Sequence, residues 1–335
     1  MSKENKLWYK IARKIIKSGG VPFPISASLI EIVRILFTEE QAKIVLSFKK
    51  RSMSLDQLVL KSKLDKQTVL KLVEEMVRNG VMVATPSRST GIMVYHLLGP
   101  VPGIFEMQFM KGETGNKQKI LAELFESFFK DIGDGYQMNY DNNMELFKQI
   151  PPLYRIIPVK EELDAPEELI LPLEIASKIV EKFDTIAVSN CYCRHHRELL
   201  NDPCKISAPK KNCLFFGRVA QFYINYNFAE EISKQEAVKL LKEAKDFGLV
   251  HRTFHSYQDP KNDEFALCNC CKCCCEVFYN LYKGNIPMKA LTSFIASVTE
   301  ELCVGCEICI EKCPMEAIGL LDNFVEINEK RCIGC

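Results

Sequence analysis

The most specific cysteine spacing in the chain lies near its C-terminus. The pattern C-x2-C-x2-C-x3-C joins Cys303, Cys306, Cys309 and Cys313, and Pro314 follows at once. Thiolates at the first three positions can bind one face of a cubane of iron and sulfide, while the fourth points toward a neighbouring cluster. The spacing therefore predicts a [4Fe-4S] site. The alternatives are unpaired core cysteines or zinc, whose motifs usually pair two short C-x2-4-C segments that lie far apart.

A shorter motif ends the sequence: Cys332 and Cys335 in RCIGC, separated from Cys313 by 18 residues. From about Ala296 onward the chain resembles the two-cluster ferredoxins, in which the second motif continues with two more cysteines. The resemblance implies three thiolates for each cluster: Cys303, Cys306 and Cys309 for one, and Cys313, Cys332 and Cys335 for the other. We expect the natural protein to continue past Cys335, or other ligands to complete the sites.

Ten further cysteines lie in the middle of the chain. They are Cys191 and Cys193 in CYCRHH, Cys204, Cys213, and then Cys268, Cys270, Cys271, Cys273, Cys274 and Cys275 in CNCCKCCC. Six cysteines within eight residues cannot all be inert small hydrophobic side chains, and sulfur-rich clusters bind soft metals. The pattern predicts one or two additional iron–sulfur clusters, with zinc as the alternative.

The sequence leaves the ligand sets of these clusters open. In one arrangement Cys191, Cys193, Cys204 and Cys213 bind one cluster, and four of the six cysteines over 268–275 bind another. In the arrangement that we prefer, each group contributes a pair to each cluster, because adjacent cysteines project in different directions and can serve two sites. A non-cubane cluster on the C-C pairs is a third arrangement, and it would imply catalysis.

Basic residues stand beside these cysteines. Arg194, His195 and His196 follow Cys193, and Lys211 precedes Cys213 by two residues. We expect a cationic shell that donates hydrogen bonds to sulfur and offsets cluster charge, with Arg194, His195 and Lys211 in contact with the cofactor. A histidine ligand, as in Rieske centres, and simple exposure to solvent are the alternatives.

Length and composition indicate an ordinary globular protein of two or three domains. The chain has 335 residues, is 47% hydrophobic and contains 16 cysteines. It has no signal peptide and no apolar run of 18 residues that could span a membrane. Clustered cysteines in a reducing, cytoplasmic setting are typical of metal ligands, and such oxygen-sensitive sites indicate an anaerobe.

Charge is unevenly distributed along the chain. Residues 1–120 contain 20 Lys and Arg against 10 Asp and Glu, whereas residues 121–335 contain 24 against 33. This asymmetry indicates separate domains. A basic domain also raises the hypothesis of a nucleic-acid partner, although lysines on solvated helix faces are the commoner explanation.

Residues 39–115 are predicted to form three helices and a hairpin. The helices cover 39–48, 54–61 and 65–78, and the last stops at Asn79-Gly80. Two strands over 81–84 and 92–97 flank a turn. This order resembles a winged helix-turn-helix.

The side chains of the predicted third helix are the evidence for and against DNA binding. Lys66, Gln67, Thr68 and Lys71 would face the major groove, and Arg88 in the wing would contact phosphate. Glu74 and Glu75 lie on the same helix and would repel the DNA backbone. DNA therefore stays possible but disfavoured, and protein docking is the preferred role.

Residues 121–295 are expected to be mostly helical with short extended segments. A buried strand over 185–188 leads into Cys191, Ser233 and Glu236 form a capping box for a helix ending at Asp246, and 250–254 is extended. We thus expect an α+β protein: a winged-helix domain over 1–120, a mostly helical Cys-rich domain over 121–295, and a partial ferredoxin-like 4Fe-4S module over 296–335.

The order of these parts resembles a known family. A winged-helix-like N-terminus, IAVSNCYCR, CNCCKCCC and a ferredoxin module are similar to the multi-cluster 4Fe-4S binding proteins of strictly anaerobic bacteria and archaea. The resemblance implies [4Fe-4S] clusters, two in the ferredoxin module of the complete protein and one or two in the middle domain. It implies electron transfer without specifying a substrate.

The sequence predicts a relay of low-potential electrons between a soluble redox carrier and a partner oxidoreductase. We expect an electron-transfer protein or oxidoreductase subunit rather than a stand-alone enzyme, since dinucleotide, Walker and nucleophile-elbow motifs are missing. One rival is a redox-sensing transcription regulator whose cluster controls DNA binding by the winged helix. Another is a reductase with a special cluster in the middle domain.

Overall fold

The chain divides into two compact units. The computed structural model describes residues 3–19, 21, 23–137, 154–164, 166, 170–171, 174–254, 264–283 and 292–335. Unit 1 comprises Met1–Gly135, Leu199–Asn201 and Asn225–Phe228, and unit 2 comprises Tyr136–Glu198, Asp202–Ile224 and Ala229–Cys335. Among the described residues no helix is long and apolar enough to cross a membrane. The proposed domain boundaries after residues 120 and 295 stay predictions.

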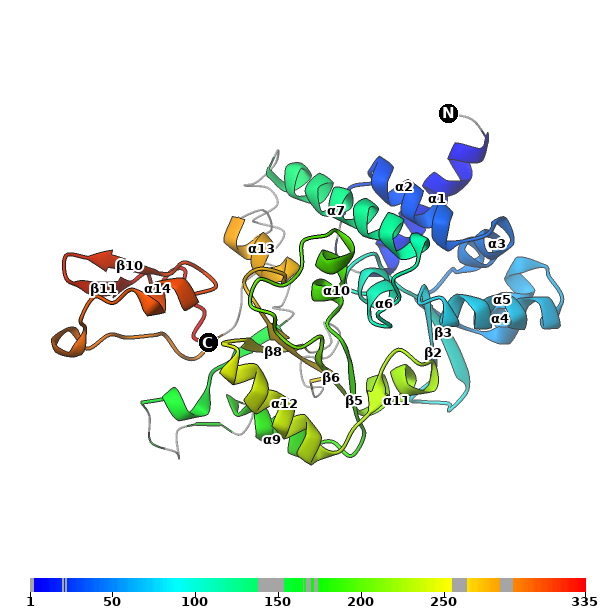
Figure 1. Ribbon diagram of the computed structural model, residues 1–335. Helices are drawn as coiled ribbons and strands as arrows, with labels where there is room; N and C mark the ends of the chain where they lie inside the picture. The colour runs from blue at the N-terminus through cyan, green and yellow to red at the C-terminus, as the bar shows by residue number, and fades with distance from the viewer. Residues whose placement is uncertain are drawn as a thin grey trace. The chain divides into compact units, whose positions relative to one another are not determined.

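Unit 1 combines helices with one small antiparallel sheet (Figure 1). Its helices are α1 (Lys3–Gly19), α2 (Ala27–Leu36), α3 (Glu39–Ser47), α4 (Leu55–Ser62), α5 (Lys66–Arg78), α6 (Ile104–Phe109) and α7 (Asn116–Gln137). Its strands β1 (Ser52–Ser54), β2 (Met82–Pro86) and β3 (Met93–Leu97) pair in the order β1-β3-β2. Phe105 and Phe125 belong to an aromatic cluster between α6 and α7, with ring centroids 5.2 Å apart.

Side-chain caps fix the start of the three helices that the sequence predicted. Thr38, Ser54 and Asp65 each accept a hydrogen bond from the backbone N–H three residues later. The helix α5 ends before Gly80, whose φ of +69° favours glycine. Three helices and a hairpin are therefore present close to their predicted positions, and their assignment as a winged helix-turn-helix stays a prediction.

Unit 2 is built on a six-stranded antiparallel sheet. Its strands are β4 (Tyr154–Ile157), β5 (Ile186–Asn190), β6 (Lys211–Phe216), β7 (Glu230–Glu231), β8 (Val250–Phe254) and β9 (Ala266–Cys270), in the order β4-β8-β9-β6-β5-β7. Its helices are α9 (Ala176–Glu181), α10 (Tyr192–Leu199), α11 (Gly217–Asn225), α12 (Lys234–Asp246), α13 (Glu276–Lys283) and α14 (Ile308–Lys312), with 3-10 turns at Lys160–Glu162 and Glu300–Leu302. The middle region was expected to be mostly helical with short extended segments, and the structure has helices together with this six-stranded sheet. Two of its strands, β6 and β9, contain cysteines that the sequence analysis treated only as ligands.

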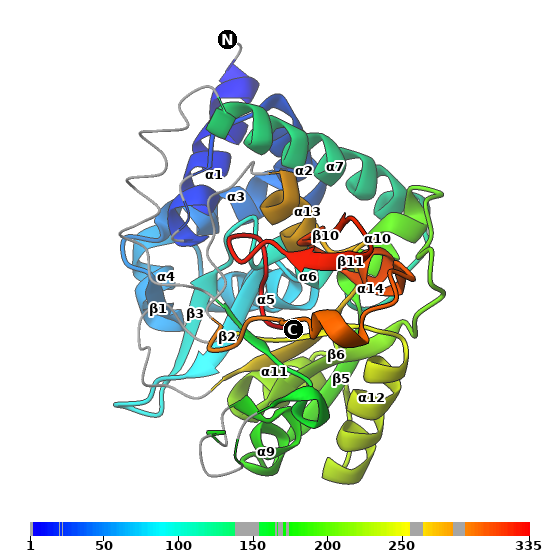
Figure 2. The same ribbon diagram turned by 90° about the vertical axis from the view of Figure 1, so that its left-hand side faces the viewer.

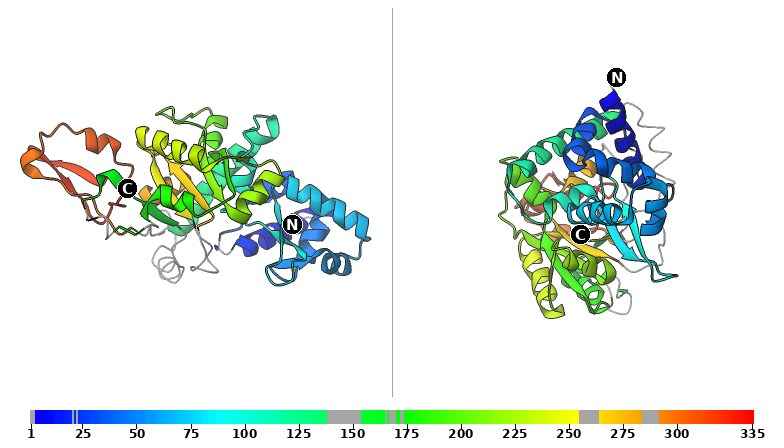
Figure 3. Two further views of the ribbon diagram at one scale, coloured as in Figure 1. Left: turned by 90° about the horizontal axis from the view of Figure 1, so that it is seen from below. Right: turned by 90° about the vertical axis from the view of Figure 1, so that its right-hand side faces the viewer.

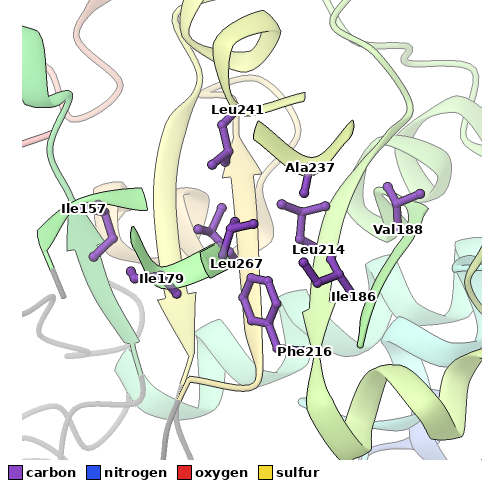
Figure 4. Packing of buried hydrophobic residues seen from close by; sticks show 10 residues of the cluster. Ile157, Ile179, Ile186, Val188, Leu214, Phe216, Ala237, Leu241 and Leu267 are labelled. Carbon is purple, nitrogen blue, oxygen red and sulfur yellow. The ribbon is translucent and has the colours of Figure 1, made fainter. Parts of the chain in front are cut away.

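One face of this sheet is an aliphatic core. Helices α9 and α12 lie against it, as Figure 2 shows at the lower side of the view. The residues that pack together, drawn as sticks in Figure 4, are Ile157, Ile179, Val180, Ile186, Val188, Leu214, Phe216, Ala237, Leu241 and Leu267. The predicted capping box of Ser233 and Glu236 is present at the start of α12. This core makes the sheet a rigid base for the residues on its other face.

The last part of unit 2, residues 296–335, is the segment that was predicted to form a ferredoxin-like module. Strands β10 (Ile318–Leu321) and β11 (Phe324–Ile327) form an antiparallel hairpin with Leu321 opposite Phe324. Helix α14 lies beside this hairpin, as the orange and red ribbons of Figure 3 show. Val325 and Ile333 are among the few buried aliphatic residues of the module. Such a small core makes the module dependent on other stabilising interactions, which metal ligation can supply.

We expect Gly80→Ala to destabilise unit 1 more than Gly91→Ala. Both glycines have positive φ, +69° and +68°, so alanine at either position costs about 1–2 kcal/mol of backbone strain. A Cβ at Gly80 would also lie 2.8 Å from Met107 Cβ, whereas a Cβ at Gly91 meets nothing within 4 Å. Urea unfolding of both variants measures the difference in unfolding free energy. Equal losses would contradict the tight packing at Gly80.

Candidate metal centres

The second face of the unit 2 sheet carries thiols and one buried cation. Side chains alternate between the faces of a sheet, and Leu214 and Leu267 belong to the aliphatic core. Their neighbours Cys213 and Cys268 therefore lie on the opposite face, and so does Arg252, which is the cross-strand partner of Cys268. Strands β6, β8 and β9 thus bring together cysteines that are far apart in the sequence.

Two short helices add further thiols to this face. Cys191 directly precedes α10, whose first turn contains Cys193, and Cys275 directly precedes α13. The backbone N–H of Cys191 donates to the Lys210 carbonyl at 2.7 Å, which ties the end of β5 to the start of β6. A helix N-terminus favours negative charge, so Cys191 and Cys275 are placed where thiolates are stabilised.

Six buried thiols form what we call the six-thiol ring. Each interacts most strongly with the two beside it, in the order Cys191, Cys193, Cys275, Cys270, Cys268, Cys213 and back to Cys191. The ring lines a small cavity together with Arg252, Tyr192, Cys271 and Cys274. The Tyr192 hydroxyl lies 3.7 Å from Cys268 Sγ. This is a thiol-rich site whose donor set fits an iron–sulfur cluster.

Ionisation alternates around the six-thiol ring. The pKa of Cys191 is well below its ordinary value because its sulfur accepts hydrogen bonds from Cys193 and Cys213. The pKa of Cys193 is well above its ordinary value, because hydrogen bonding with the neighbouring sulfurs of Cys191 and Cys275, followed by burial, favours its protonated form. Of the six ring thiols, Cys191, Cys268 and Cys275 thus favour the thiolate, the form that binds metals, and the other three favour the protonated thiol.

Arg252 supplies a positive charge inside this site. It is 1% exposed, and its Cζ lies 5.0, 4.7 and 5.5 Å from the ring centroids of Tyr154, Phe254 and Phe278. Burial opposes the charge, but the thiolates, Cys270 foremost, hold the pKa of Arg252 well above its ordinary value. Its Nε and Nη1 have no hydrogen-bond partner among the described residues. Donors buried beside thiols in this way fit a negatively charged cluster.

The predicted basic residues occupy three different environments. Arg194 is 2% exposed and donates to the carbonyls of Pro209 and Asn269, each at 3.0 Å. Burial lowers the pKa of Arg194, but the thiolates of Cys191, Cys271 and Cys213 outweigh this and raise it.

The other two basic residues pair with carboxylates. His195 is buried and its Nδ1 lies 3.4 Å from Glu198 Oε2. Lys211 is exposed and its Nζ contacts Glu230 at 2.6 Å. Cofactor contact by all three predicted residues stays a prediction, and the geometry favours Arg194 most.

The remaining middle-region cysteines form a second cluster of thiols, the four-thiol group: Cys204, Cys271, Cys273 and Cys274. Two of its members, Cys271 and Cys274, also line the cavity of the six-thiol ring. Their sulfurs all lie within 4.8 Å of one another. This grouping differs from both partitions considered from the sequence, because three of its members come from CNCCKCCC and one from the segment after α10. Each C-C pair at 270–271 and 274–275 is divided between the ring and the group.

In the ferredoxin-like module, three thiols come together. Burial, followed by the charges of Cys313 and Cys332, raises the pKa of Cys335 to about 11. The backbone N–H of Ala317 donates to Cys313 Sγ at 3.2 Å. These three are the set predicted for the second cluster. The other predicted set, Cys303, Cys306 and Cys309, lies before and in α14, with the last two exposed.

Sequence reasoning missed Arg252 and the acid that supports α10. Glu276 Oε1 lies 3.2 Å from Arg197 Nη2 and 3.5 Å from His196 Nδ1, with all three residues largely buried. A lone arginine in a predicted strand carries no signal of its own. In a strand every second residue lies on the same face, so the predicted strand over 250–254 would have placed Arg252 on one face together with Val250 and Phe254.

Comparison with known proteins identifies one part of the chain. Residues 296–319 match the family "4Fe-4S binding domain". The matched segment contains Cys303, Cys306, Cys309 and Cys313. A stretch of 31 residues is 61% identical to Protein Pixie of Drosophila melanogaster. This stretch makes up 9% of this chain and 5% of that protein. No solved structure matches the chain. The chain therefore contains a 4Fe-4S binding domain, and a much larger part of it lies outside these similarities.

If the six-thiol ring holds an iron–sulfur cluster, we expect Arg252→Gln to lower the reduction potential of that cluster. Removing a buried positive charge beside the thiolates makes addition of an electron less favourable, while glutamine keeps a polar side chain. Anaerobic redox titration followed by EPR measures the potential. Lys239→Gln removes an equal charge from an exposed position of α12 and serves as the control. An unchanged potential in Arg252→Gln would contradict the proximity of this charge to a cluster.

Proposed function

We propose that this chain is an electron-transfer iron–sulfur protein of an anaerobe. In this proposal the ferredoxin-like module exchanges low-potential electrons with a soluble carrier in the cytoplasm, and a cluster in the six-thiol ring passes them to a partner oxidoreductase. The observation that carries the proposal is the presence of a 4Fe-4S binding domain in the same unit as a buried ring of six thiols.

The two thiol sites differ in exposure, and this supports a relay. Cys306 and Cys309 are exposed, as expected of a cluster that meets a soluble carrier. The six ring cysteines are all buried, so a cluster there is shielded from solvent and its potential depends on the protein around it.

Within unit 2 one ion pair joins the module to the turn after β9. Lys272 Nζ lies 3.0 Å from Glu316 Oε1, and both side chains are 43% exposed. Such an exposed pair contributes about 0–1 kcal/mol, so it supports proximity more than strong docking. A weakly held module suits a carrier that must also meet its redox partners.

In unit 1 the helices and hairpin are proposed to form a winged helix that docks a partner protein. Lys66 Nζ pairs with Asp56 at 2.9 Å, and the Thr68 hydroxyl donates to Asp65, so two of the side chains predicted to face DNA are already engaged. Glu74 is exposed one turn after Lys71 and would repel phosphate. This surface of mixed charge favours protein over DNA.

We expect Cys306→Ala to remove one low-potential EPR signal and to leave the remaining iron in place. The exposed Cys306 belongs to the 4Fe-4S binding domain and not to the six-thiol ring, so its loss should affect a single cluster. Iron and sulfide quantitation with EPR of the reduced full chain measures the result. Leu302→Ala, a neighbouring residue that is 80% exposed, is the control. Loss of all iron from Cys306→Ala would refute a modular relay.

We also expect the intact chain to show no sequence-selective binding to duplex DNA at physiological salt. A DNA reader would lose affinity steeply with salt, with a log–log slope of about −0.9 per phosphate contact. Gel shifts over a salt series, with oxidised and reduced protein, measure this. A saturable, sequence-selective shift that changed on cluster reduction and weakened in Lys71→Gln would favour a redox-sensing regulator.

A further inference from the structure

The four sulfurs of the four-thiol group lie close together. Cys204 Sγ lies 3.8 Å from Cys271 Sγ and 3.7 Å from Cys273 Sγ, and Cys273 Sγ lies 3.6 Å from Cys274 Sγ. No pair of sulfurs in the group exceeds 4.8 Å. The shortest separation is far beyond the disulfide bond length of about 2.05 Å, so these are four separate thiols.

These separations fit one tetrahedral metal ion. A zinc–thiolate bond is about 2.3 Å long, so four thiolates at the corners of a tetrahedron around one zinc stand about 3.8 Å apart. The measured separations of 3.6, 3.7 and 3.8 Å agree with this value within the tolerance expected of a metal site. A cubane places four irons and four sulfides between its ligands, which holds the cysteine sulfurs much farther apart.

The surroundings of the group indicate a structural role. Cys271 and Cys274 pack in a small cluster with Ala208, Ala244 and Leu249, and Cys204 and Cys273 lie against it. The group joins the segment after α10 to the turn between β9 and α13. Four protein thiolates leave no open coordination position, which is the arrangement of structural rather than catalytic zinc sites.

We propose that Cys204, Cys271, Cys273 and Cys274 bind a single Zn²⁺ ion and that this ion holds the turn between β9 and α13 in place. The proposal goes beyond electron transfer, because zinc is redox-inactive. It also assigns the middle region one iron–sulfur site, the six-thiol ring, where the sequence predicted one or two.

The direct test is zinc and iron analysis of the intact chain purified without oxygen from medium containing both metals. We expect one zinc per chain, with X-ray absorption at the zinc edge showing four sulfur ligands at about 2.3 Å. This measurement needs no variant, so it does not depend on the folding of a mutant. Absence of bound zinc after addition of Zn²⁺, or nitrogen and oxygen ligands at the zinc edge, would overturn the proposal.

A pair of variants separates this site from the electron-transfer clusters. We expect Cys204→Ser to lose its zinc and to keep its iron and its EPR signals, whereas Cys306→Ser loses iron and keeps its zinc. Loss of iron with unchanged zinc in Cys204→Ser would overturn the zinc assignment. Because the two metals are counted separately, failure of the zinc proposal and failure of the electron-transfer proposal give different results.

Discussion

The alternation of side chains along β6, β8 and β9 is the constraint on which the buried site depends. Leucine and phenylalanine side chains on one face of the sheet, such as Leu214 and Phe216, pack against α9 and α12. Cysteine and arginine side chains on the other face, such as Cys268 and Arg252, lie opposite each other on neighbouring strands. A slip of one residue in register would exchange the two faces and place thiolates in the aliphatic core. The aliphatic core therefore fixes the positions of the thiols.

Burial of charge is the second constraint. An isolated ion in a protein interior is strongly disfavoured, so buried charges occur in pairs. Here Arg194 and Arg252 stand among thiols, and each kind of group favours the charged form of the other. The rings of Tyr154 and Phe254, with centroids 5.0 and 4.7 Å from Arg252 Cζ, add cation–π attraction. Removing either charge type alone would leave the other uncompensated.

The sequence predicted the parts of the structure that depend on local signals. The 4Fe-4S motif around Cys303 and the capping box at Ser233 are local patterns, and both are found. The ring and the group could not be derived, because their members meet through cross-strand pairing between segments such as β6 and β9. The strand character of β9 was obscured because Cys268 and Cys270 were considered only as ligands. Arg252 gave no local signal, since its role comes from its neighbours in space.

The division of the C-C pairs has a consequence for how the metal sites are assembled. Cys270 belongs to the ring and Cys271 to the group, and Cys274 and Cys275 are divided in the same way. Consecutive Cα atoms are held about 3.8 Å apart, so ordering one site restricts the ligands of the other. In the proposed arrangement, an ion that fixed residues 271–274 would also restrict the positions open to Cys270 and Cys275, so the loading of one site would depend on the other.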